Sequence, residues 1–471
     1  MLTDHIKKQI IKELVHEPTK GQEQLINMLS EFCVPTSIKK ILLLKGYAGT
    51  GKTTLISAFI NAMSSFKQKL HLITPTGRAA KVLSAYSGKM AFTIHKKIYR
   101  QTSSKDGLGK FSLDKNLHKN TFFIVDEASM ISNRGDGSAF GSGRLLDDLI
   151  KYVFDGENCK LIIVGDTAQL PPVNSDLSPA LDIKELETYG YSINDIELTE
   201  VIRQAQNSGI LFNATEIRNL INNNKNSFPK IKLENFNDVK KINGEELIDV
   251  IGESYDKDGI ENTIIVTRSN KRANIFNQGI RNRILWKEDE ISVGDVIMIV
   301  KNNYFWMPEN EHTDFIANGD IAEIVRIGKY EELYNQRYVD LTIRFADYND
   351  LEVDVKAFLN TLNLETASMG IDAGKELFYK IAEDYAHITP KPKMYKAVKE
   401  DKYLNALQIK FAYAVTCHKA QGGQWKNVFI DHGYITDKML NVEFLRWLYT
   451  AFTRAEKTVY LVNFNKEFFF D

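Results

Sequence analysis

The sequence predicts an α/β protein built on parallel β-sheets that carry helices on both faces. Short apolar runs at 41–45, 121–125 and 161–164 are typical of fully buried strands. Stretches compatible with helices lie between the runs, at 52–65 and 77–86. Buried strands that alternate with helices indicate a parallel sheet, because the crossover helices pack against both of its faces.

Length and composition place the chain among ordinary folded proteins. Its 471 residues suffice for three or four domains at roughly 100–200 residues each. A formal net charge of −1 argues against a protein that coats nucleic acid through a global basic field. The three cysteines show neither metal-ligand spacing nor a disulfide framework. With no signal peptide and no apolar run near the roughly 18 residues that span a bilayer, we expect a soluble, cytoplasmic protein without membrane contact.

The second half of the chain predicts a second lobe, which begins after about residue 205. It contains a strand at 262–267, a helix at 269–283, strands around 296–300 and 409–415, and a last strand at 458–463. Between roughly 322 and 404 the pattern changes. Alternating strands come first, and a helical stretch and a Lys-rich segment at 391–402 follow. This pattern indicates a small β-barrel inserted into the second lobe.

Residues 98–119 interrupt the first sheet. They are polar and contain glycine, with isolated apolar residues such as Tyr99 and Phe111, which suits a small β-hairpin. The window from Thr93 to Lys119 carries seven Lys or Arg side chains against two Asp in an otherwise nearly neutral protein. The alternative interpretation is a solvated basic loop.

A phosphate-binding loop follows the first predicted strand. The segment GYAGTGKTT at 46–54 matches G-x-x-x-x-G-K-[ST], with a strand before it and a helix after it. Lys52 is expected to reach the β- and γ-phosphates, and the Thr53 hydroxyl to bind Mg²⁺. The residues predicted to line the nucleotide here are Gly46, Ala48, Gly49, Thr50, Gly51, Lys52, Thr53 and Thr54.

Two adjacent carboxylates, Asp126 and Glu127, end the strand TFFIV. An acidic residue at such a strand end holds the magnesium shell in phosphate-loop enzymes, which we expect of Asp126. We expect Glu127 to orient and deprotonate the attacking water. An Asp-Glu pair alone also suits a solvated turn, but its pairing with the phosphate loop favours a hydrolysis site.

Further side chains are candidates at this site. Gln169, in GDTAQLPPV after the strand 161–164, is expected to contact the γ-phosphate or the attacking water. Arg203 and Arg454 are candidate arginine fingers, which contribute about 10³–10⁵ in rate; each also suits a surface ion pair. Gln22 has two compatible interpretations, because Thr19-x-x-Gln22 matches a capping box and a contact with adenine is the functional alternative.

The order of the motifs resembles the superfamily 1 helicases, and most closely their RecD/Dda branch, which translocates 5′→3′. The motifs are GYAGTGKTT, TPTGRAAKVL (74–83), TIHK (93–96), VDEASM, GDTAQLPPV, LTEVIRQ, VTCHKAQGGQW (415–425) and LYTAFTRAEK (448–457). The resemblance covers approximately residues 19–300 and 408–463. Residues 98–119 and 322–404 correspond only in position and general character.

The resemblance implies two RecA-like lobes with ATP and Mg²⁺ between them. The expected division is 1–97 and 120–205 for lobe 1, 98–119 for a hairpin insertion, 206–321 and 405–471 for lobe 2, and 322–404 for a small SH3-like barrel. Gln22, Lys52, Thr53, Asp126, Glu127, Gln169 and Arg203 would serve the nucleotide from lobe 1, and Gly423 and Arg454 from lobe 2. One departure is Gln424, where many family members carry a Glu that contacts the ribose.

The resemblance also implies a path for DNA across both lobes. The implied DNA contacts are Pro75, Thr76, Thr93, His95, Lys96 and Phe111 from lobe 1, and Thr416, His418 and Lys419 from lobe 2. The expected function is an ATP-dependent 5′→3′ DNA helicase that acts as a monomer on single-stranded and forked duplex DNA. Phe111 on the hairpin would stack at the fork. The alternatives are a single-strand translocase that does not separate strands and an RNA-directed motor.

Overall fold

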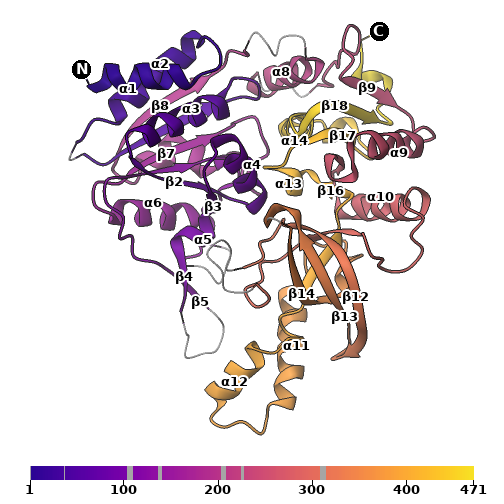
Figure 1. The fold of residues 1–471 in the computed structure, drawn as a ribbon. Helices are drawn as coiled ribbons and strands as arrows, with labels where there is room; N and C mark the ends of the chain where they lie inside the picture. The colour runs from indigo at the N-terminus through magenta and orange to yellow at the C-terminus, as the bar shows by residue number, and fades with distance from the viewer. Residues whose placement is uncertain are drawn as a thin grey trace.

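The computed structural model describes residues 2–470 apart from 37, 103–109, 136–140, 203–207, 224–226, 308–314 and 349. Two α/β lobes lie side by side, and a β-barrel with a helical extension adjoins the second lobe (Figure 1). Within the described residues, no helix combines the length and apolarity that a bilayer span requires. The cysteines Cys33, Cys159 and Cys417 are free, and the latter two are buried.

Lobe 1 contains a parallel sheet in the order β3-β2-β6-β7-β1-β8. Its strands are β1 (Lys40–Gly46), β2 (Lys69–Thr74), β3 (Ala91–Thr93), β6 (Thr121–Val125), β7 (Lys160–Gly165) and β8 (Ser192–Leu198). Its helices are α1 (Leu2–Glu13), α2 (Lys20–Phe32), α3 (Lys52–Ser65), α4 (Gly77–Ser87), α5 (Ile94–Ile98), α6 (Leu145–Asp155) and α7 (Ile183–Glu187).

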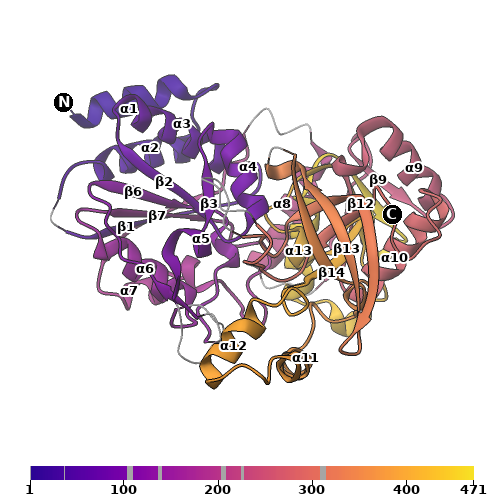
Figure 2. The same cartoon turned by 60° about the horizontal axis from the view of Figure 1, so that its bottom comes forward.

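The apolar runs of lobe 1 are continuous because both faces of the sheet are buried. In β1, Leu42 and Leu44 pack in the core under α1, α2 and α3, whereas Ile41 and Leu43 pack in the opposite core with α6. Figure 2 shows helices on both sides of this sheet. Successive side chains of a strand point to opposite faces, so a strand covered on both faces is apolar at every position.

A hairpin leaves lobe 1 after α5, as the sequence predicts. It consists of β4 (Tyr99–Thr102) and β5 (Lys110–Leu113), which pair antiparallel with Tyr99 opposite Leu113. Leu108, another apolar residue of the 98–119 segment, lies outside the described residues. Only the base of the hairpin can therefore be placed against its neighbours.

Lobe 2 contains a second parallel sheet in the order β16-β10-β17-β18-β9. Its strands are β9 (Val239–Ile242), β10 (Thr263–Thr267), β16 (Ala414–Thr416), β17 (Trp425–Asp431) and β18 (Ala455–Val462). Its helices are α8 (Gly209–Asn222), α9 (Leu247–Asp258), α10 (Asn270–Arg283), α13 (Cys417–Ala420) and α14 (Val442–Phe452). In one core of this lobe, α8 and α14 pack together.

The barrel is closed and takes five strands, β11 (Val296–Ile299), β12 (Ile321–Leu333), β13 (Gln336–Phe345), β14 (Leu351–Phe358) and β15 (Leu407–Phe411). The strands expected around 296–300 and 409–415 form, but most of their residues join the barrel and not the parallel sheet. β11 pairs antiparallel with β12 and β15, and only β16 joins the parallel sheet. An apolar run has the same sequence pattern in a barrel and in a parallel sheet. The pattern therefore could not show which strands it pairs with.

Two helices extend from the barrel, α11 (Ile371–Asp384) and α12 (Lys391–Lys399). They lie between β14 and β15, which pair directly through Ala357–Leu407 and Phe358–Gln408. A small core holds the two helices to the barrel, and it includes Leu377, Ile381, Val398, Tyr338 and Phe358. The extension points to the same end of the molecule as the β4–β5 hairpin (Figure 1).

Candidate functional site

The motif residues of lobe 1 gather at one edge of its sheet. Strands β1, β2, β6 and β7 end at Gly46, Thr74, Val125 and Gly165, and a motif segment follows each of them. Parallel strands bring their carboxyl ends to the same edge, which is where ligands bind in open α/β sheets. The fold therefore places these segments together although Gly46 and Gly165 are 119 positions apart in the chain.

The phosphate loop has the backbone that its glycines permit. Gly49 and Gly51 adopt φ values of 75° and 78°, in the left-handed region that L side chains avoid. A Cβ atom at Gly51 would lie 2.5 Å from Nε2 of Gln22 and 2.7 Å from Cδ1 of Ile202. The loop ends on α3, whose N-terminus directs backbone N–H groups and partial positive charge toward an anion.

Lys52 is held within the loop. Its Nζ donates to the carbonyl of Tyr47 at 2.8 Å and lies 3.9 Å from Oδ2 of Asp166. Thr53 follows in the first turn of α3 and is partly accessible. Both side chains can therefore reach a phosphate group or a cation held by the loop.

Asp126 and Glu127 follow β6. The Asp126 amide donates to the Ile73 carbonyl at 3.0 Å, and its Oδ1 accepts from the Glu127 amide at 2.8 Å. Burial, and next the neighbouring Glu127, raise the pKa of the Asp126 carboxyl to about 7. A carboxylate in that environment is stabilised by a cation, so Asp126 and Thr53 fit a divalent metal ion with oxygen ligands.

Gln22 caps its helix and also holds the phosphate loop. Its Oε1 accepts from the Thr19 amide at 3.1 Å, and Thr19 Oγ1 accepts from the Gln22 amide at 3.3 Å, so the capping box is formed. The Gln22 Nε2 donates to the Thr50 carbonyl at 3.0 Å. Both ends of the amide are thus occupied in this structure, and a contact with adenine stays a prediction.

Tyr449 of α14 joins the two lobes at the phosphate loop. Its hydroxyl donates to Oδ2 of Asp166 at 2.7 Å and accepts from the Ala48 amide at 2.8 Å. Tyr449 is 1% exposed, and burial, with Asp166 next, raises its pKa well above the usual value. The hydroxyl therefore stays protonated and links one lobe to two segments of the other.

Four neighbouring hydrogen bonds extend this junction, between α14 or the end of α13 and the segment after β7. The Leu170 amide donates to Thr450 Oγ1 at 2.9 Å, and Gln421 Nε2 donates to the Leu170 carbonyl at 2.7 Å. Arg446 donates to the carbonyls of Thr167 and Gln169. The described lobes are therefore in direct contact through a hydrogen-bonded seam.

Sequence reasoning missed three residues of this junction, Asp166, Arg446 and Tyr449. Asp166 and Tyr449 stand inside the motifs GDTAQLPPV and LYTAFTRAEK, so their position in a motif was an available signal. Arg446 stands two residues before the second motif, and only the fold brings it to lobe 1. Gln169 is buried as part of the same segment, and its Oε1 accepts from Ser129 Oγ at 3.4 Å.

Of the two predicted arginine fingers, the structure describes Arg454 and not Arg203. Arg454 is 4% exposed, and its guanidinium donates to the carbonyls of Thr450 and Gly423 at 3.1 and 3.2 Å, within lobe 2. Gly423 in turn lies against Arg78, which stacks on Trp425 at 3.9 Å. Arg203 lies outside the described residues.

The predicted DNA residues of lobe 1 begin the helices α4 and α5. Thr76 and Thr93 are N-caps, which accept from the amides of Ala79 at 3.3 Å and Lys96 at 3.2 Å. Pro75 and Thr76 directly follow β2 and are partly accessible. These caps orient the helix N-termini, which are suited to phosphate contacts.

His95, Lys96 and Phe111 lie around the base of the hairpin. The His95 ring is 5.8 Å from that of Tyr99, and Lys96 Nζ is 5.4 Å from the centroid of Phe92. Phe111 is partly buried, with its ring 4.5 Å from that of Tyr304. Phe111 therefore packs between lobe 1 and the segment that follows β11.

The predicted DNA residues of lobe 2 follow β16. Thr416 is the N-cap of α13, His418 is exposed, and Lys419 donates to Oδ1 of Asn318 before β12. Burial, and next Lys410, lower the pKa of Lys419 to about 8. The structure therefore brings these residues to the edge that lobe 2 shares with the barrel.

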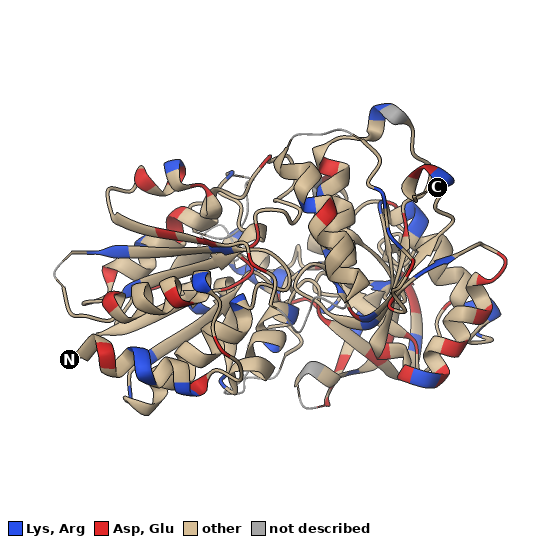
Figure 3. Cartoon of the chain, turned by 90° about the horizontal axis from the view of Figure 1, so that it is seen from above, with Lys and Arg blue, Asp and Glu red and all other residues tan. Residues whose placement is uncertain are grey.

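Basic and acidic residues alternate over most of the two lobes. Figure 3 shows basic and acidic residues interspersed over both lobes. A global electrostatic field therefore does not direct the molecule to nucleic acid, and binding depends on local groups.

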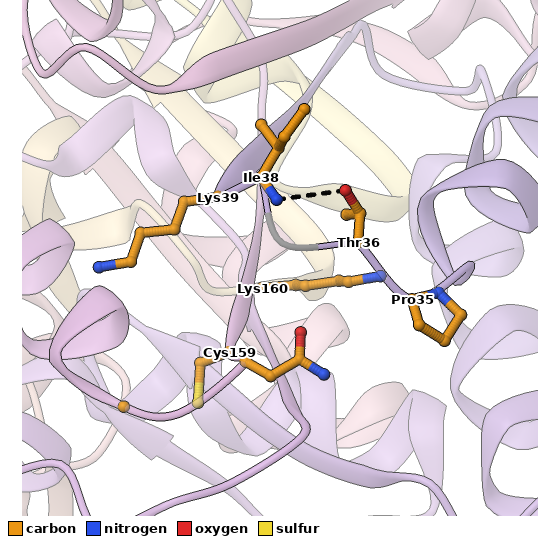
Figure 4. Close-up of a pocket in the computed structure, with 8 residues that line it drawn as sticks. Pro35, Thr36, Ile38, Lys39, Cys159 and Lys160 are labelled. Atoms are coloured by element: carbon orange, nitrogen blue, oxygen red, sulfur yellow. Dashed lines mark hydrogen bonds between the residues drawn. The ribbon is translucent and has the colours of Figure 1, made fainter.

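A cavity of about 460 Å³ lies at the opposite edge of the lobe 1 sheet, between the starts of β1 and β7 (Figure 4). Its lysines are committed to carbonyls. Lys39 Nζ donates to Phe154 at 2.7 Å, and Lys160 Nζ donates to Phe32 at 2.5 Å and Val34 at 2.8 Å. This cavity is therefore unrelated to the phosphate loop, which follows the other end of β1.

Comparisons with known proteins agree with the motif order. Residues 19–223 match the family described as AAA domain, and residues 411–462 match the UvrD-like helicase C-terminal domain. The ATP-dependent RecD2 DNA helicase of Deinococcus radiodurans is 24% identical over 88% of this chain. The ATP-dependent DNA helicase dda of Enterobacteria phage T4 is 28% identical over 60% of it.

The chain spans 46% and 60% of the lengths of these two relatives. An uncharacterized protein of Acanthamoeba polyphaga mimivirus is 26% identical and matches over 93% of this chain and 98% of its own length. Among solved structures, a Pif1 helicase from Bacteroides in complex with ADP-AlF3 and ssDNA has a TM-score of 0.48 at 14% identity. It covers 97% of this chain and 95% of its own.

The two matched domains stand in the order in which the structure places the lobes, and the phosphate loop, the Asp-Glu pair and the LYTAFTRAEK motif each lie in the expected domain. Over both matched regions the chain is therefore similar to superfamily 1 helicases of the RecD and Dda type.

Proposed function

We propose that this protein is an ATP-dependent helicase that moves 5′→3′ along single-stranded DNA and separates duplex ahead of it, acting as a monomer. The observation that carries the proposal is the junction at the phosphate loop. There the Tyr449 hydroxyl of lobe 2 accepts a hydrogen bond from the Ala48 amide and donates one to the Asp166 carboxylate of lobe 1. Two lobes joined at a nucleotide loop can change their separation when the nucleotide changes, and a motor requires that coupling.

The hydrolysis chemistry is assigned to lobe 1. Lys52 binds the β- and γ-phosphates, and Glu127 takes a proton from the attacking water, which Gln169 helps to orient. Thr53 and Asp126 hold a magnesium ion that, when bound, neutralises phosphate charge. The raised pKa of Asp126 supports this assignment, because a desolvated carboxylate gains most from a cation.

Arg203 and Arg454 are proposed to stabilise the charge that develops on the γ-phosphate. For Arg454 this requires that its guanidinium exchange the carbonyls of Thr450 and Gly423 for phosphate oxygens. Such an exchange joins nucleotide binding to the end of α14, which carries the seam with lobe 1. An arginine in this role contributes about 10³–10⁵ in rate.

DNA is proposed to lie across the carboxyl edges of both sheets, where Thr76 and Thr93 face it from lobe 1 and Thr416 and Lys419 from lobe 2. Phosphate contacts from helix N-termini and a lysine give little sequence preference and a strong dependence on salt. Changes in lobe separation would alter these two sets of contacts in turn, so that the strand advances in one direction.

The test is Glu127→Gln, with Glu187→Gln as the matched control on the exposed surface of α7. The Glu127 variant should bind ATP and single-stranded DNA with unchanged affinity while it loses DNA-stimulated ATPase activity. The control should keep both. ATP turnover by the Glu127 variant at the wild-type rate would refute its role as the base.

Strand separation and polarity need a second assay on the wild-type protein. Forks with a single 5′ tail or a single 3′ tail are offered with ATP, and release of the displaced strand is followed. We expect unwinding from the 5′ tail alone. ATPase stimulation without strand release would identify a translocase, and stronger stimulation by RNA than by DNA would identify an RNA-directed motor.

A further inference from the structure

The helical extension of the barrel has its own basic surface, which the proposed function leaves unused. α12 has the sequence KPKMYKAVK, with four lysines and no acidic residue. Lys391, Lys393 and Lys396 are exposed. In a protein whose formal net charge is −1, this concentration of one sign on a nine-residue helix is a local exception.

Two lysines of this surface form no ion pair within the described part of the chain. Lys396 has a long contact of 3.9 Å with Glu400, and Lys391 and Lys393 form no ion pair with any described residue. On α11, by contrast, Lys380 lies 2.7 Å from Glu376 and Lys375 lies 3.7 Å from Asp372. The two neighbouring helices therefore differ in whether their lysines are available.

The extension is also rigid enough to present these charges in a defined place. Val398 of α12 is buried with Leu377 and Ile381 of α11 and with Phe358 of the barrel. The rings of Phe378 and Tyr395 lie 5.7 Å apart between the two helices. Because β14 and β15 pair directly where the extension leaves and returns, the barrel closes without needing it.

From these observations we infer that α12 binds the phosphate backbone of the duplex ahead of the fork. The inference rests on the proposed function. Lysines without partners are point charges that bind phosphates without reading sequence. The extension lies at the end of the molecule reached by the β4–β5 hairpin, away from the single-strand residues beside α4 and α13 (Figure 1). Since the hairpin is the expected position of the fork, DNA bound at this place would lie ahead of strand separation.

The experiment compares two double variants with equal changes in charge. Lys391→Ala with Lys393→Ala removes the lysines without partners, and Lys375→Ala with Lys380→Ala removes paired lysines from α11. Fluorescence anisotropy measures the affinity of each protein for a 5′-tailed duplex and for the same tail alone, from 50 to 200 mM salt. Each contact to duplex phosphate contributes about 0.9 to the slope of log K against log salt.

For the tailed duplex, we expect the slope of log K against log salt to be smaller by up to about 1.8 in the α12 variant than in wild type. Between 50 and 200 mM salt, this difference corresponds to about a 12-fold change in relative affinity. Its affinity for the tail alone, and its ATPase activity with single strands, should match wild type. The α11 control should behave as wild type with both DNAs. The same preference for the tailed duplex in wild type and α12 variant would overturn the inference and leave a solvated helix.

Two other outcomes would also overturn it. Equal loss of affinity for the tail and for the tailed duplex would place the lysines on the single-strand path. Equal losses in the α11 and α12 variants would indicate a general charge effect. A failure of the proposed function is distinguishable, because wild-type protein would then show no ATPase stimulation by single strands.

Discussion

Replacing Tyr449 with Phe removes one oxygen atom from the junction between the lobes. That oxygen donates to Asp166 at 2.7 Å and accepts from the Ala48 amide at 2.8 Å, in a site where Tyr449 is 1% exposed. Asp166 keeps the Ala168 amide at 2.9 Å as a partner, whereas no other hydrogen bond is described for the Ala48 amide. The variant therefore loses the hydroxyl link to both segments without creating a large cavity.

The magnitude follows from the two hydrogen bonds. A bond to a charged group contributes roughly 1.5–3 kcal/mol, and a buried N–H left without a partner costs roughly 1–3 kcal/mol. If the loss destabilises the closed arrangement of the lobes by only about 2 kcal/mol, the ratio of closed to open molecules falls by about 30-fold. Because the nucleotide site needs both lobes, kcat/KM for ATP should fall by about that factor.

The assay is DNA-stimulated ATP hydrolysis at saturating single-stranded DNA, with circular dichroism to verify that the lobes stay folded. Tyr338→Phe is the matched control, since the buried Tyr338 hydroxyl in the barrel has no hydrogen-bond partner among the described residues. The control should stay within about twofold of wild type. If Tyr449→Phe also stays within twofold, the junction does not couple the lobes and the reasoning fails.

The remaining predictions concern the hairpin and two titrating groups. Phe111→Ala should impair unwinding while DNA-stimulated ATPase activity persists, and a parallel loss of both in the two assays would argue against a pin at the fork. Because the pKa of Lys419 is lowered to about 8, its charge is present at pH 7 and mostly lost at pH 9. Affinity for single strands should fall over that interval and the salt slope by about 0.7, with no such change in Lys419→Arg. Burial, then Lys97 and His118, lower the pKa of His71 to about 3, so the folded protein keeps this imidazole neutral while the unfolded chain takes up a proton near pH 6.5. Thermal stability should therefore be full above pH 6.5 and decline below it, less steeply in His71→Gln; a Tm that does not change between pH 7 and 5 would contradict this.

Local chemistry was enough to predict the phosphate loop and the strands that carry it. The motif requires glycine at Gly51, where the backbone is left-handed, and that requirement is independent of the rest of the fold. The run 121–125 is apolar from Phe122 to Val125 and matches β6 at both ends. Strand ends then predicted that Asp126 and Lys52 share an edge, because parallel strands align their carboxyl ends.

The partners of a strand or a side chain were decided by tertiary structure. The runs at 296–300 and 409–415 have the same apolar pattern in a barrel as in a parallel sheet, so only pairing distinguishes them. Arg454 is in its motif, yet the atoms that its guanidinium contacts depend on the orientation of α14. The composition of 391–402 shows that the segment is basic. Only the structure shows which lysines of α11 and α12 form ion pairs, such as Lys380 and Lys396.

By itself the sequence determined the chemistry of the nucleotide loop, the alternation of buried strands and helices, and the order of the motifs, since each depends on residues close together in the chain. Only the tertiary structure decided that Tyr449 meets Ala48 and Asp166 across the lobes, and that α12 stands apart with exposed charge. The physical reason is the separation of the interacting residues along the chain. A hydrogen bond between residues 401 positions apart leaves no local pattern, because it exists only once both cores have formed.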